Sequence, residues 1–452
     1  MFYLALLITK LVDAVIRTLS LGAGSTWPGH IALALYPNIL QKLTKNSNVK
    51  IILVAGTNGK TTTSLIIKSI LEESQMKVMH NQEGANLLNG IVTAFIGNTS
   101  IVKSNVAIDG NAAVFEIDEN ALPQVLKQIT PHGIILLNLF RDQLDRYGEV
   151  DIIADKWRTA LSHVSKETTV VVNADDPQLA HLSHSTKAHV IPFTIDSSHF
   201  KKQAQSHDVD STYCPECGTK LHYSSYSYSH LGYYLCQKCS FARPKKVQDY
   251  SHFLSQSHLK GIYNAYNISA AITLVKSVFT SIDTDIVRAL GTMKPAFGRQ
   301  EVIDYKGRKV LMLLSKNPVG FNQSIAVAND VLKDKNNRVL VCLNDRIPDG
   351  RDISWIWDVE FENLYKPNRP IFISGDRATD MGVRFQYCMK KTEELATASK
   401  SYSIKNIYVY PRLVDAIDAS VGATGAGGTL VVMATYSAML EVREILVGRK
   451  LL

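Results

Sequence analysis

The chain has 452 residues, of which 46% are hydrophobic and 20% are charged, a globular balance that allows roughly two to four domains. The formal net charge is +8, but the Lys and Arg residues are scattered. This pattern argues against a nucleic-acid-binding protein and favours weak attraction to anionic substrates or an anionic membrane surface. Four of the six cysteines lie in one short stretch, so a disulfide framework is not indicated and a reducing compartment is expected.

Residues 1–48 are predicted to form an amphipathic helical segment. Lys10, Asp13 and Arg17 interrupt the apolar start before it reaches the roughly 20 residues that a membrane span needs, and no basic region precedes it as in a signal peptide. We therefore expect a cytoplasmic protein with this helix packed on its body. Lipid contact at the inner face of the membrane stays open as the alternative. The helical stripe consists of Leu4, Leu7, Leu11, Val15 and Leu19.

From residue 49 onward, short apolar runs alternate with helical patterns. Runs such as "KIILVAG" (50–56) and "GIILLNL" (133–139) lack polar alternation, which indicates a parallel sheet covered on both faces. The sequence thus predicts an α/β fold with a central domain at 49–297 and a C-terminal Rossmann-like α/β domain at 298–452. Between about 205 and 248 the composition shifts to Ser, Tyr, His, Lys and Cys, and we interpret this stretch as an insertion.

The stretch "GTNGKTTT" (56–63) follows an apolar strand and begins a helical pattern. It resembles the phosphate loop G-x-x-x-x-G-K-[ST], except that Val54 stands at the first glycine position. Backbone N–H groups at a helix N-terminus bind anions. Lys60 can neutralise phosphate charge, and Thr61 can hold Mg²⁺ through its hydroxyl. The alternative is a plain strand–turn–helix connection with a surface lysine.

A magnesium–nucleotide site also needs a carboxylate, and the run "AAVFEIDE" (112–119) supplies three. Mg²⁺ takes one or two carboxylates beside phosphate and water. Glu116 directly follows the apolar part of the run, so we predict it as the magnesium ligand. For Asp118 and Glu119 a solvated acidic turn is an equal alternative.

Four cysteines are spaced C-x₂-C-x₁₈-C-x₂-C, which is within the spacing of four-thiolate zinc sites. Four thiolates complete a tetrahedron and leave no open position, so the predicted zinc is structural. Unligated thiols or a redox pair are the alternatives. The predicted zinc ligands are Cys214, Cys217, Cys236 and Cys239.

The loop also resembles the ATP loop of the Mur ligases and folylpolyglutamate synthases, which lack the same glycine. "NLFRDQLDRYGE" (138–149) is similar to their N-x-x-x-D-H-L-D-x-x-G element, with Asn138, Asp142 and Asp145 on matching positions. "GIYNAYNISAA" (261–271) and "FGRQE" (297–301) follow in the order of that superfamily. The resemblance implies a P-loop ATPase domain in which the helix asparagines lie against the adenine and Arg299 near the phosphates; helix capping is the alternative for the asparagines. The implied ATP-binding residues are Gly56, Thr57, Asn58, Gly59, Lys60, Thr61, Thr62, Asn264, Asn267 and Arg299.

A Mur-like core with a four-cysteine insertion, followed by "SKNPVGFNQ" and "NDRIPDGRDISWIWDVEFE", resembles the MurT family. Members of that family are synthetase subunits of lipid II isoglutaminyl synthases. The resemblance implies ATP-dependent amidation of the D-glutamate α-carboxyl of lipid II through an acyl phosphate, with ammonia from a GatD-type glutaminase subunit in a heterodimer. It further implies that the C-terminal domain contacts this partner and that Asp352 orients the partner's catalytic histidine. An Asp that caps the helix "ISWIWDVEF" is the alternative, and Asp358 is a further candidate.

The sequence offers independent support for a missing glutaminase. Such an enzyme needs a nucleophilic cysteine on a sharp turn, but Cys342 lies within an apolar run and Cys388 has no Gly-flanked turn. In addition, Leu314 or Ser315 and Lys316 replace the Asp and His of the superfamily's D-Y-A-H-N-P element, which is compatible with ammonia as the nucleophile. Two alternatives stay open: a self-sufficient amino-acid ligase of the Mur or folylpolyglutamate type, and a zinc-ribbon binding module on a degenerate ATPase.

Overall fold

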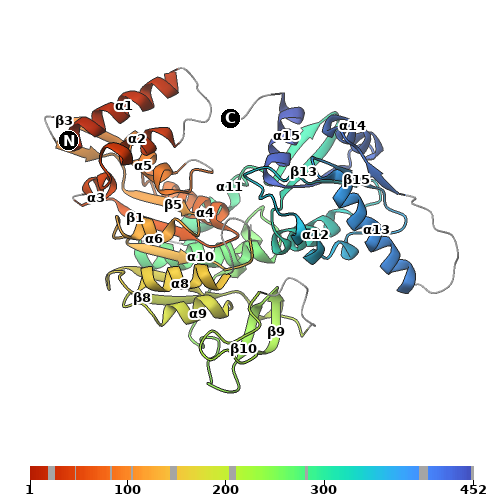
Figure 1. The fold of residues 1–452 in the computed structure, drawn as a ribbon, viewed down its shortest axis with the longest axis horizontal. Helices are drawn as coiled ribbons and strands as arrows, with labels where there is room; N and C mark the ends of the chain where they lie inside the picture. Colours follow the sequence, from red (N-terminus) through yellow and green to blue (C-terminus); the bar gives the residue numbers. More distant parts are fainter. Residues whose placement is uncertain are drawn as a thin grey trace.

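The computed structural model describes residues 1–18, 26–45, 47–81, 84–102, 105–142, 150–202, 210–279, 283–395 and 406–448. Asp145 lies outside these residues. The described chain folds around two sheets, each covered by helices, and a small insertion protrudes from the first (Figure 1). We call the seven-stranded sheet with its helices the first unit and the six-stranded sheet with its helices the second unit.

The sheet of the first unit is entirely parallel and has the order β11-β8-β7-β6-β1-β5-β2. Its central strands are apolar on both faces because helices cover both. The sequence analysis predicted this arrangement from the unbroken apolar runs. The strands are β1 (Lys50–Ala55), β2 (Val78–His80), β5 (Ala112–Ile117), β6 (Gly133–Leu136), β7 (Thr169–Asn173), β8 (His189–Thr194) and β11 (Gln248–Asp249).

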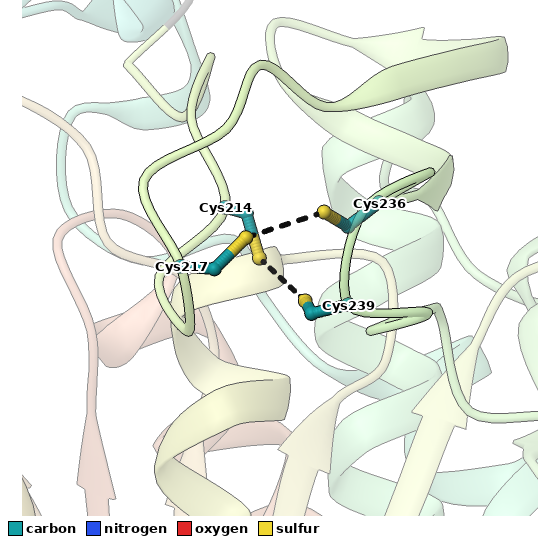
Figure 2. A group of neighbouring side chains, drawn as sticks. All are labelled: Cys214, Cys217, Cys236 and Cys239. Atoms are coloured by element: carbon teal, nitrogen blue, oxygen red, sulfur yellow. Dashed lines mark hydrogen bonds between the residues drawn. The ribbon is translucent and has the colours of Figure 1, made fainter.

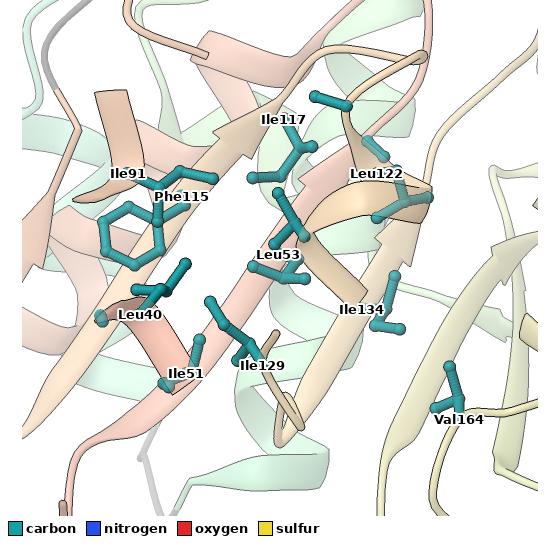
Figure 3. Close-up of a cluster of buried hydrophobic side chains, with 14 of the residues drawn as sticks. Leu40, Ile51, Leu53, Ile91, Phe115, Ile117, Leu122, Ile129, Ile134 and Val164 are labelled. Atoms are coloured by element: carbon teal, nitrogen blue, oxygen red, sulfur yellow. The ribbon is translucent and has the colours of Figure 1, made fainter. Parts of the chain in front are cut away.

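Alternate residues of β1 point into two separate cores. Ile51 and Leu53 join the core beneath α5, α6, α8 and α9, part of which is drawn in Figure 3. Ile52 and Val54 join the opposite core beneath α4, α10 and α11. The first group of helices is α5 (Leu88–Gly97), α6 (Leu122–Leu126), α8 (Val150–Leu161) and α9 (Pro177–Ser183); the second is α4 (Lys60–Glu73), α10 (Ile262–Val278) and α11 (Asp283–Thr292).

Three N-terminal helices pack on the α5 side of this unit: α1 (Phe2–Thr18), α2 (Trp27–Leu35) and α3 (Ile39–Thr44). The hairpin of β3 (Thr99–Val102) and β4 (Asn105–Ile108) follows α5. The predicted helix is present and contacts the body, but it does so through Ala5, Leu6 and Thr9. The stripe identified from the sequence is instead exposed at Leu4, Leu7, Leu11 and Val15.

The second unit has the strand order β12-β13-β17-β14-β15-β16, in which only the pairing of β12 with β13 is antiparallel. Helices α12 and α13 cover one face, and α14 and α15 cover the other. The strands are β12 (Arg299–Tyr305), β13 (Arg308–Leu314), β14 (Arg338–Cys342), β15 (Ile371–Ser374), β16 (Ile407–Val409) and β17 (Thr429–Ala434). The helices are α12 (Pro318–Val331), α13 (Ala378–Leu395), α14 (Leu413–Ala423) and α15 (Tyr436–Val447).

The helix expected over "ISWIWDVEF" is instead two short 3₁₀ turns, η3 (Ser354–Asp358) and η4 (Phe361–Asn363). Two further 3₁₀ turns, η1 (Ser197–His199) and η2 (Ser251–Gln256), flank the insertion. Among the described helices, none combines the length and apolar character that crossing a bilayer requires.

Candidate nucleotide and metal sites

The loop between β1 and α4 is shaped by two glycines. Gly56 and Gly59 have φ values of +144° and +91°, which glycine adopts most readily. A Cβ on Gly59 would lie 2.2 Å from Oδ1 of Asn267, and one on Gly56 would lie 2.9 Å from Cβ of Leu137. Both positions therefore require glycine because the loop lies tightly against α10 and the segment after β6.

Lys60 is the first residue of α4 and is buried. Its ammonium donates to the carbonyl of Gly56 at 2.5 Å, to the carbonyl of Thr57 at 3.1 Å, and to Glu119 at 3.1 Å. A phosphate oxygen can replace such acceptors, since the lysine side chain is flexible and carries three donors. Glu119 is also buried, so the alternative that this residue belongs to a solvated acidic turn is wrong.

The hydroxyl of Thr61 donates to the carboxylate of Glu116. Asn81 fixes the Glu116 backbone from both sides: its Oδ1 accepts from Glu116 N at 3.0 Å, and its Nδ2 donates to Glu116 O at 3.0 Å. A hydroxyl and a carboxylate at the phosphate loop are the hard oxygen donors that Mg²⁺ prefers. The two predicted magnesium ligands thus lie together, and the donor set fits the ion.

These residues line a cavity of about 440 Å³ between the two units, a volume typical of small-molecule sites. Its first-unit wall contains Thr57, Asn58, Gly59, Lys60, Thr61, Thr62, Glu116, Asn264 and Asn267, and Arg299 lies at the start of the second unit. Of the residues predicted to bind ATP, only Gly56 lies outside the lining.

The two asparagines of α10 do not act as helix caps. The helix starts after Gly261, and no side chain caps it. Asn264 Nδ2 donates to the carbonyl of Lys260 at 2.8 Å, and Asn267 Nδ2 donates to Asn264 Oδ1 at 3.0 Å. Both residues are buried and line the cavity.

Lys316 of the second unit was noted in the sequence only as a departure from the superfamily pattern. It lines the cavity, and its ammonium contacts the carboxylate of Asp142 in the first unit. Burial alone would lower the pKa of Lys316, but the negative charges of Asp142 and Glu119 outweigh burial and raise this pKa. Lys316 is therefore a fixed positive charge rather than a general base.

Two further contacts join the units beside the phosphate loop. The amides of Asn58 and Asn317 hydrogen-bond reciprocally, at 3.3 and 3.1 Å. Gln300 Nε2 donates to the carbonyl of Lys260 at 2.7 Å, and Gln300 Oε1 accepts from the Lys260 backbone at 2.9 Å. Gln300 does this with φ of +62°, an uncommon conformation for a side-chain-bearing residue. No local sequence pattern could have identified these long-range pairs.

The four cysteine sulfurs converge within 4.8 Å of one another (Figure 2). Cys214 Sγ lies 3.6 Å from Cys239 Sγ, and Cys217 Sγ lies 3.5 Å from Cys236 Sγ. Tetrahedral zinc with bonds of about 2.3 Å needs sulfurs about 3.8 Å apart, so the cluster fits this ion. Hydrogen bonds from Thr219 lower the pKa of Cys217 to about 6, whereas burial raises the pKa of Cys214 to about 12.

The cysteines lie on two matching turns. Gly218 N donates to Cys214 O at 2.8 Å, and Ser240 N donates to Cys236 O at 3.0 Å. The last residue of each turn, directly after the second cysteine, has positive φ, +70° at Gly218 and +63° at Ser240. The first turn uses a glycine at this position, and the second turn adopts the same shape with a serine.

The hairpin of β9 (His222–Tyr228) and β10 (Leu231–Leu235) connects the cysteine cluster to the cavity. Tyr228, at the end of β9, lines the cavity, and its ring packs edge-on against Tyr266 of α10 at 5.7 Å. Arg243 anchors the insertion through Asp175 at 2.5 Å. The insertion therefore contributes a wall to the cavity, a role that the sequence did not reveal.

Asp352 is exposed and lies away from the cavity lining. Its carboxylate accepts from Ser354 N at 2.8 Å and from Ser354 Oγ at 2.9 Å. The alternative, an aspartate that caps a helix over "ISWIWDVEF", does not apply because this stretch begins with the 3₁₀ turn η3, which has no side-chain cap. The neighbouring Asp349 is buried and accepts from Ser437 N at 2.8 Å. Asp358 pairs with Arg141 at 3.4 Å. These contacts leave the Asp352 carboxylate at the surface.

The sequence of this chain is similar to two family profiles and to proteins of known name. Residues 54–275 match the family profile "Mur ligase middle domain", and residues 314–439 match "MurT ligase C-terminal". The chain is 34% identical to "Lipid II isoglutaminyl synthase (glutamine-hydrolyzing) subunit MurT" of Staphylococcus aureus (strain COL), over 80% of this chain and 83% of the relative. It is 30% identical to the protein of the same name from Streptococcus pneumoniae (strain ATCC BAA-255 / R6), over 95% and 94% of the two chains.

The fold is likewise that of a Mur ligase. The structure of a pseudomurein peptide ligase type C from Methanothermus fervidus superimposes with a TM-score of 0.61 at 20% identity, covering 90% of this chain and 80% of that one. The two profile matches and the two relatives show the family: the chain belongs to the MurT family of ligase subunits.

Proposed function

We propose that this chain is the synthetase subunit of a lipid II isoglutaminyl synthase, which converts D-glutamate in the lipid II stem peptide to D-isoglutamine during peptidoglycan synthesis. An oxygen of the α-carboxylate attacks the γ-phosphorus of ATP, and ADP leaves. Ammonia then attacks the acyl carbon, the C–O bond to phosphate breaks, and a proton is lost as the amide forms. The names of the relatives and the cavity between the units support this assignment.

The observation that carries the proposal is the meeting of Lys60, Thr61 and Glu116 at one wall of the cavity that Lys316 of the second unit also lines. Thr61 and Glu116 would hold Mg²⁺, which supplies charge neutralisation at the phosphates. Lys60 binds the β- and γ-phosphates, and Asn264 and Asn267 bind the adenine end. Phosphoryl transfer depends mainly on positioning and on such positive charges.

Ammonia is proposed to come from a partner glutaminase. Six cysteines are present: four form the cluster, and the other two, Cys342 and Cys388, are buried. Burial raises the pKa of Cys388 to about 12, and burial also raises the pKa of Cys342, so neither is a ready nucleophile. The relatives' names include "glutamine-hydrolyzing" and "subunit", which supports a GatD-type glutaminase in a heterodimer.

The proposed organisation follows the sequence analysis: the ATPase domain at 49–297 activates the carboxylate, and the domain at 298–452 binds the glutaminase. Asp352 is proposed to reach the partner's catalytic histidine, since an aspartate fixes the imidazole tautomer and stabilises its charged form. Its exposed position in the second unit leaves it accessible to a partner.

The direct test is Lys60→Ala in the complex with the glutaminase subunit, assayed for amidation of lipid II with ATP and glutamine. We expect at least about a hundredfold loss, because one preorganised cation is removed from the transferring phosphoryl group. Lys333→Ala, at an exposed site in the second unit, is the matched control and should keep full activity. Amidation that survived Lys60→Ala would refute the assignment.

A further inference from the structure

The solvent-facing side of α1 is apolar along its whole length. Leu4 is 54% exposed, Leu7 is 60% exposed and Leu11 is 67% exposed, although leucine is normally buried. These positions recur every three or four residues and so form one stripe along the helix. We define the α1 stripe as Tyr3, Leu4, Leu7, Ile8, Leu11 and Val15.

The opposite side of α1 is also apolar, but it is covered. Ala5 and Leu6 are buried in the first unit, where α1 packs against α2 and α5. A contiguous exposed apolar patch of this kind marks a protein or membrane contact. The α1 stripe is therefore a docking surface.

We propose that the α1 stripe docks on the surface of an anionic lipid bilayer. The 17 residues of α1 are fewer than the roughly 20 needed to span a bilayer, so the helix lies in the interface plane. Residues 1–48 contain four basic residues, Lys10, Arg17, Lys42 and Lys45, and one acidic residue, Asp13, which gives a net charge of +3. Exposed Trp27 at the start of α2 adds an aromatic side chain of the type enriched at lipid–water interfaces.

The fold connects this surface to the cavity. α1 packs on α5, and the residues just before α5, Asn86 and Leu87, line the cavity. Docking through α1 would thus hold the cavity one helix away from the lipid surface. This inference rests on the proposed function in that a lipid-linked substrate is the reason for such placement.

Two other occupants fit the observations less well. The glutaminase is proposed to bind beside η3, which packs on α13, and α13 lies at the opposite end of the molecule from α1 (Figure 1). A second copy meeting α1 against α1 would bring two segments of charge +3 together. Such like charges oppose association, whereas anionic headgroups attract them.

The test is co-sedimentation of the full chain with phosphatidylglycerol vesicles. We expect the unchanged chain to bind these vesicles more strongly than phosphatidylcholine vesicles. The double variant Leu7→Glu with Leu11→Glu should bind phosphatidylglycerol vesicles at least about a hundredfold more weakly than the unchanged chain, because two leucines lose burial and two negative charges are added. Val302→Glu, at an exposed apolar position on β12, is the matched control and should bind like the unchanged chain. Equal binding of the double variant, or no binding of the unchanged chain, would overturn the inference.

Two further measurements distinguish failure of the bilayer inference from failure of the proposed function. The complex with the double variant should still amidate a soluble stem peptide without the lipid, which would show that the variant folds. If the unchanged complex failed to amidate this soluble peptide, that result would contradict the proposed function and not the bilayer inference. If light scattering showed that the unchanged chain is a dimer and the double variant a monomer, the α1 stripe would be a contact with a second copy. That result would contradict the inference that the stripe binds a bilayer.

Discussion

Lys316 brings a positive charge from the second unit to a cavity whose phosphate loop belongs to the first. Its contact with Asp142 spans 174 positions of sequence. In the proposed reaction, the γ-phosphoryl group moves from ATP to the carboxylate within this cavity, and the leaving ADP gains negative charge. A fixed cation in the lining can stabilise this charge as it develops, which is the usual role of such groups in phosphoryl transfer.

Lys316→Met is therefore expected to lower the kcat of amidation by about 10²–10³-fold, with a much smaller change in the KM for ATP. Because the buried Asp142 then loses its cation, this variant should also unfold at a lower temperature. The double variant Lys316→Met with Asp142→Asn should recover stability but not turnover. A single variant with unchanged kcat would show that the lysine is only structural.

The raised pKa of Lys316 also predicts how its stabilising effect depends on pH. A lysine with a folded-state pKa above its unfolded value stabilises fully below the unfolded value, and this contribution is lost as pH rises through the folded one. The difference in unfolding temperature between the unchanged chain and Lys316→Met should thus be constant from about pH 7 to about pH 9. A difference that shrank across this range would contradict the raised pKa.

At the scale of elements, the strands and the loop after β1 were predicted correctly, whereas the helix predicted over "ISWIWDVEF" was wrong. The apolar runs predicted the central strands, and the loop after β1, with Thr61 and Glu116 side by side, follows from residues next to a strand end. The spacing of the cysteines predicted a cluster for the same reason. The buried face of α1 could not be predicted because both faces are apolar. The position of Tyr228 depends on how the insertion packs, which local patterns do not encode.

Tyr228 makes the insertion part of the proposed nucleotide site. An aromatic ring beside a base contributes about 1–3 kcal/mol, so Tyr228→Ala should raise the KM for ATP by about 5- to 150-fold, and Tyr228→Phe should have little effect. Tyr213→Ala, at an exposed site of the same insertion, is the control. If Tyr228→Ala bound ATP normally, the hairpin would be a distant structural feature.

Removal of zinc by a chelator should act through the same hairpin. The cysteine turns fix an insertion that has a small core of its own, and loss of a structural zinc destabilises such elements. We expect a lower unfolding temperature together with a raised KM for ATP, both restored by added zinc. An unchanged KM after complete metal removal, measured by elemental analysis, would uncouple the cluster from the cavity.

At the scale of the whole molecule, the cavity lies between two units that are joined by polar contacts, among them Asn58 with Asn317 and Gln300 with Lys260. The first unit carries the phosphate loop and the second carries Lys316 and Asp352. In the proposed organisation, the first unit would activate the carboxylate and the second would bind the glutaminase. Asp352→Asn should accordingly leave the complex assembled and its ammonia-dependent amidation intact while glutamine hydrolysis is lost; normal hydrolysis would exclude this role.

The most direct test of the central claim traces the amide nitrogen of glutamine into the product. The purified complex of this chain with the glutaminase subunit would be incubated with lipid II, ATP, Mg²⁺ and glutamine labelled at its side-chain amide, and the product would be analysed by mass spectrometry. The account predicts that the label appears in a new amide on the D-glutamate α-carboxyl, only when ATP is present. An unlabelled product, or an amino acid joined to that carboxyl in place of nitrogen, would contradict it.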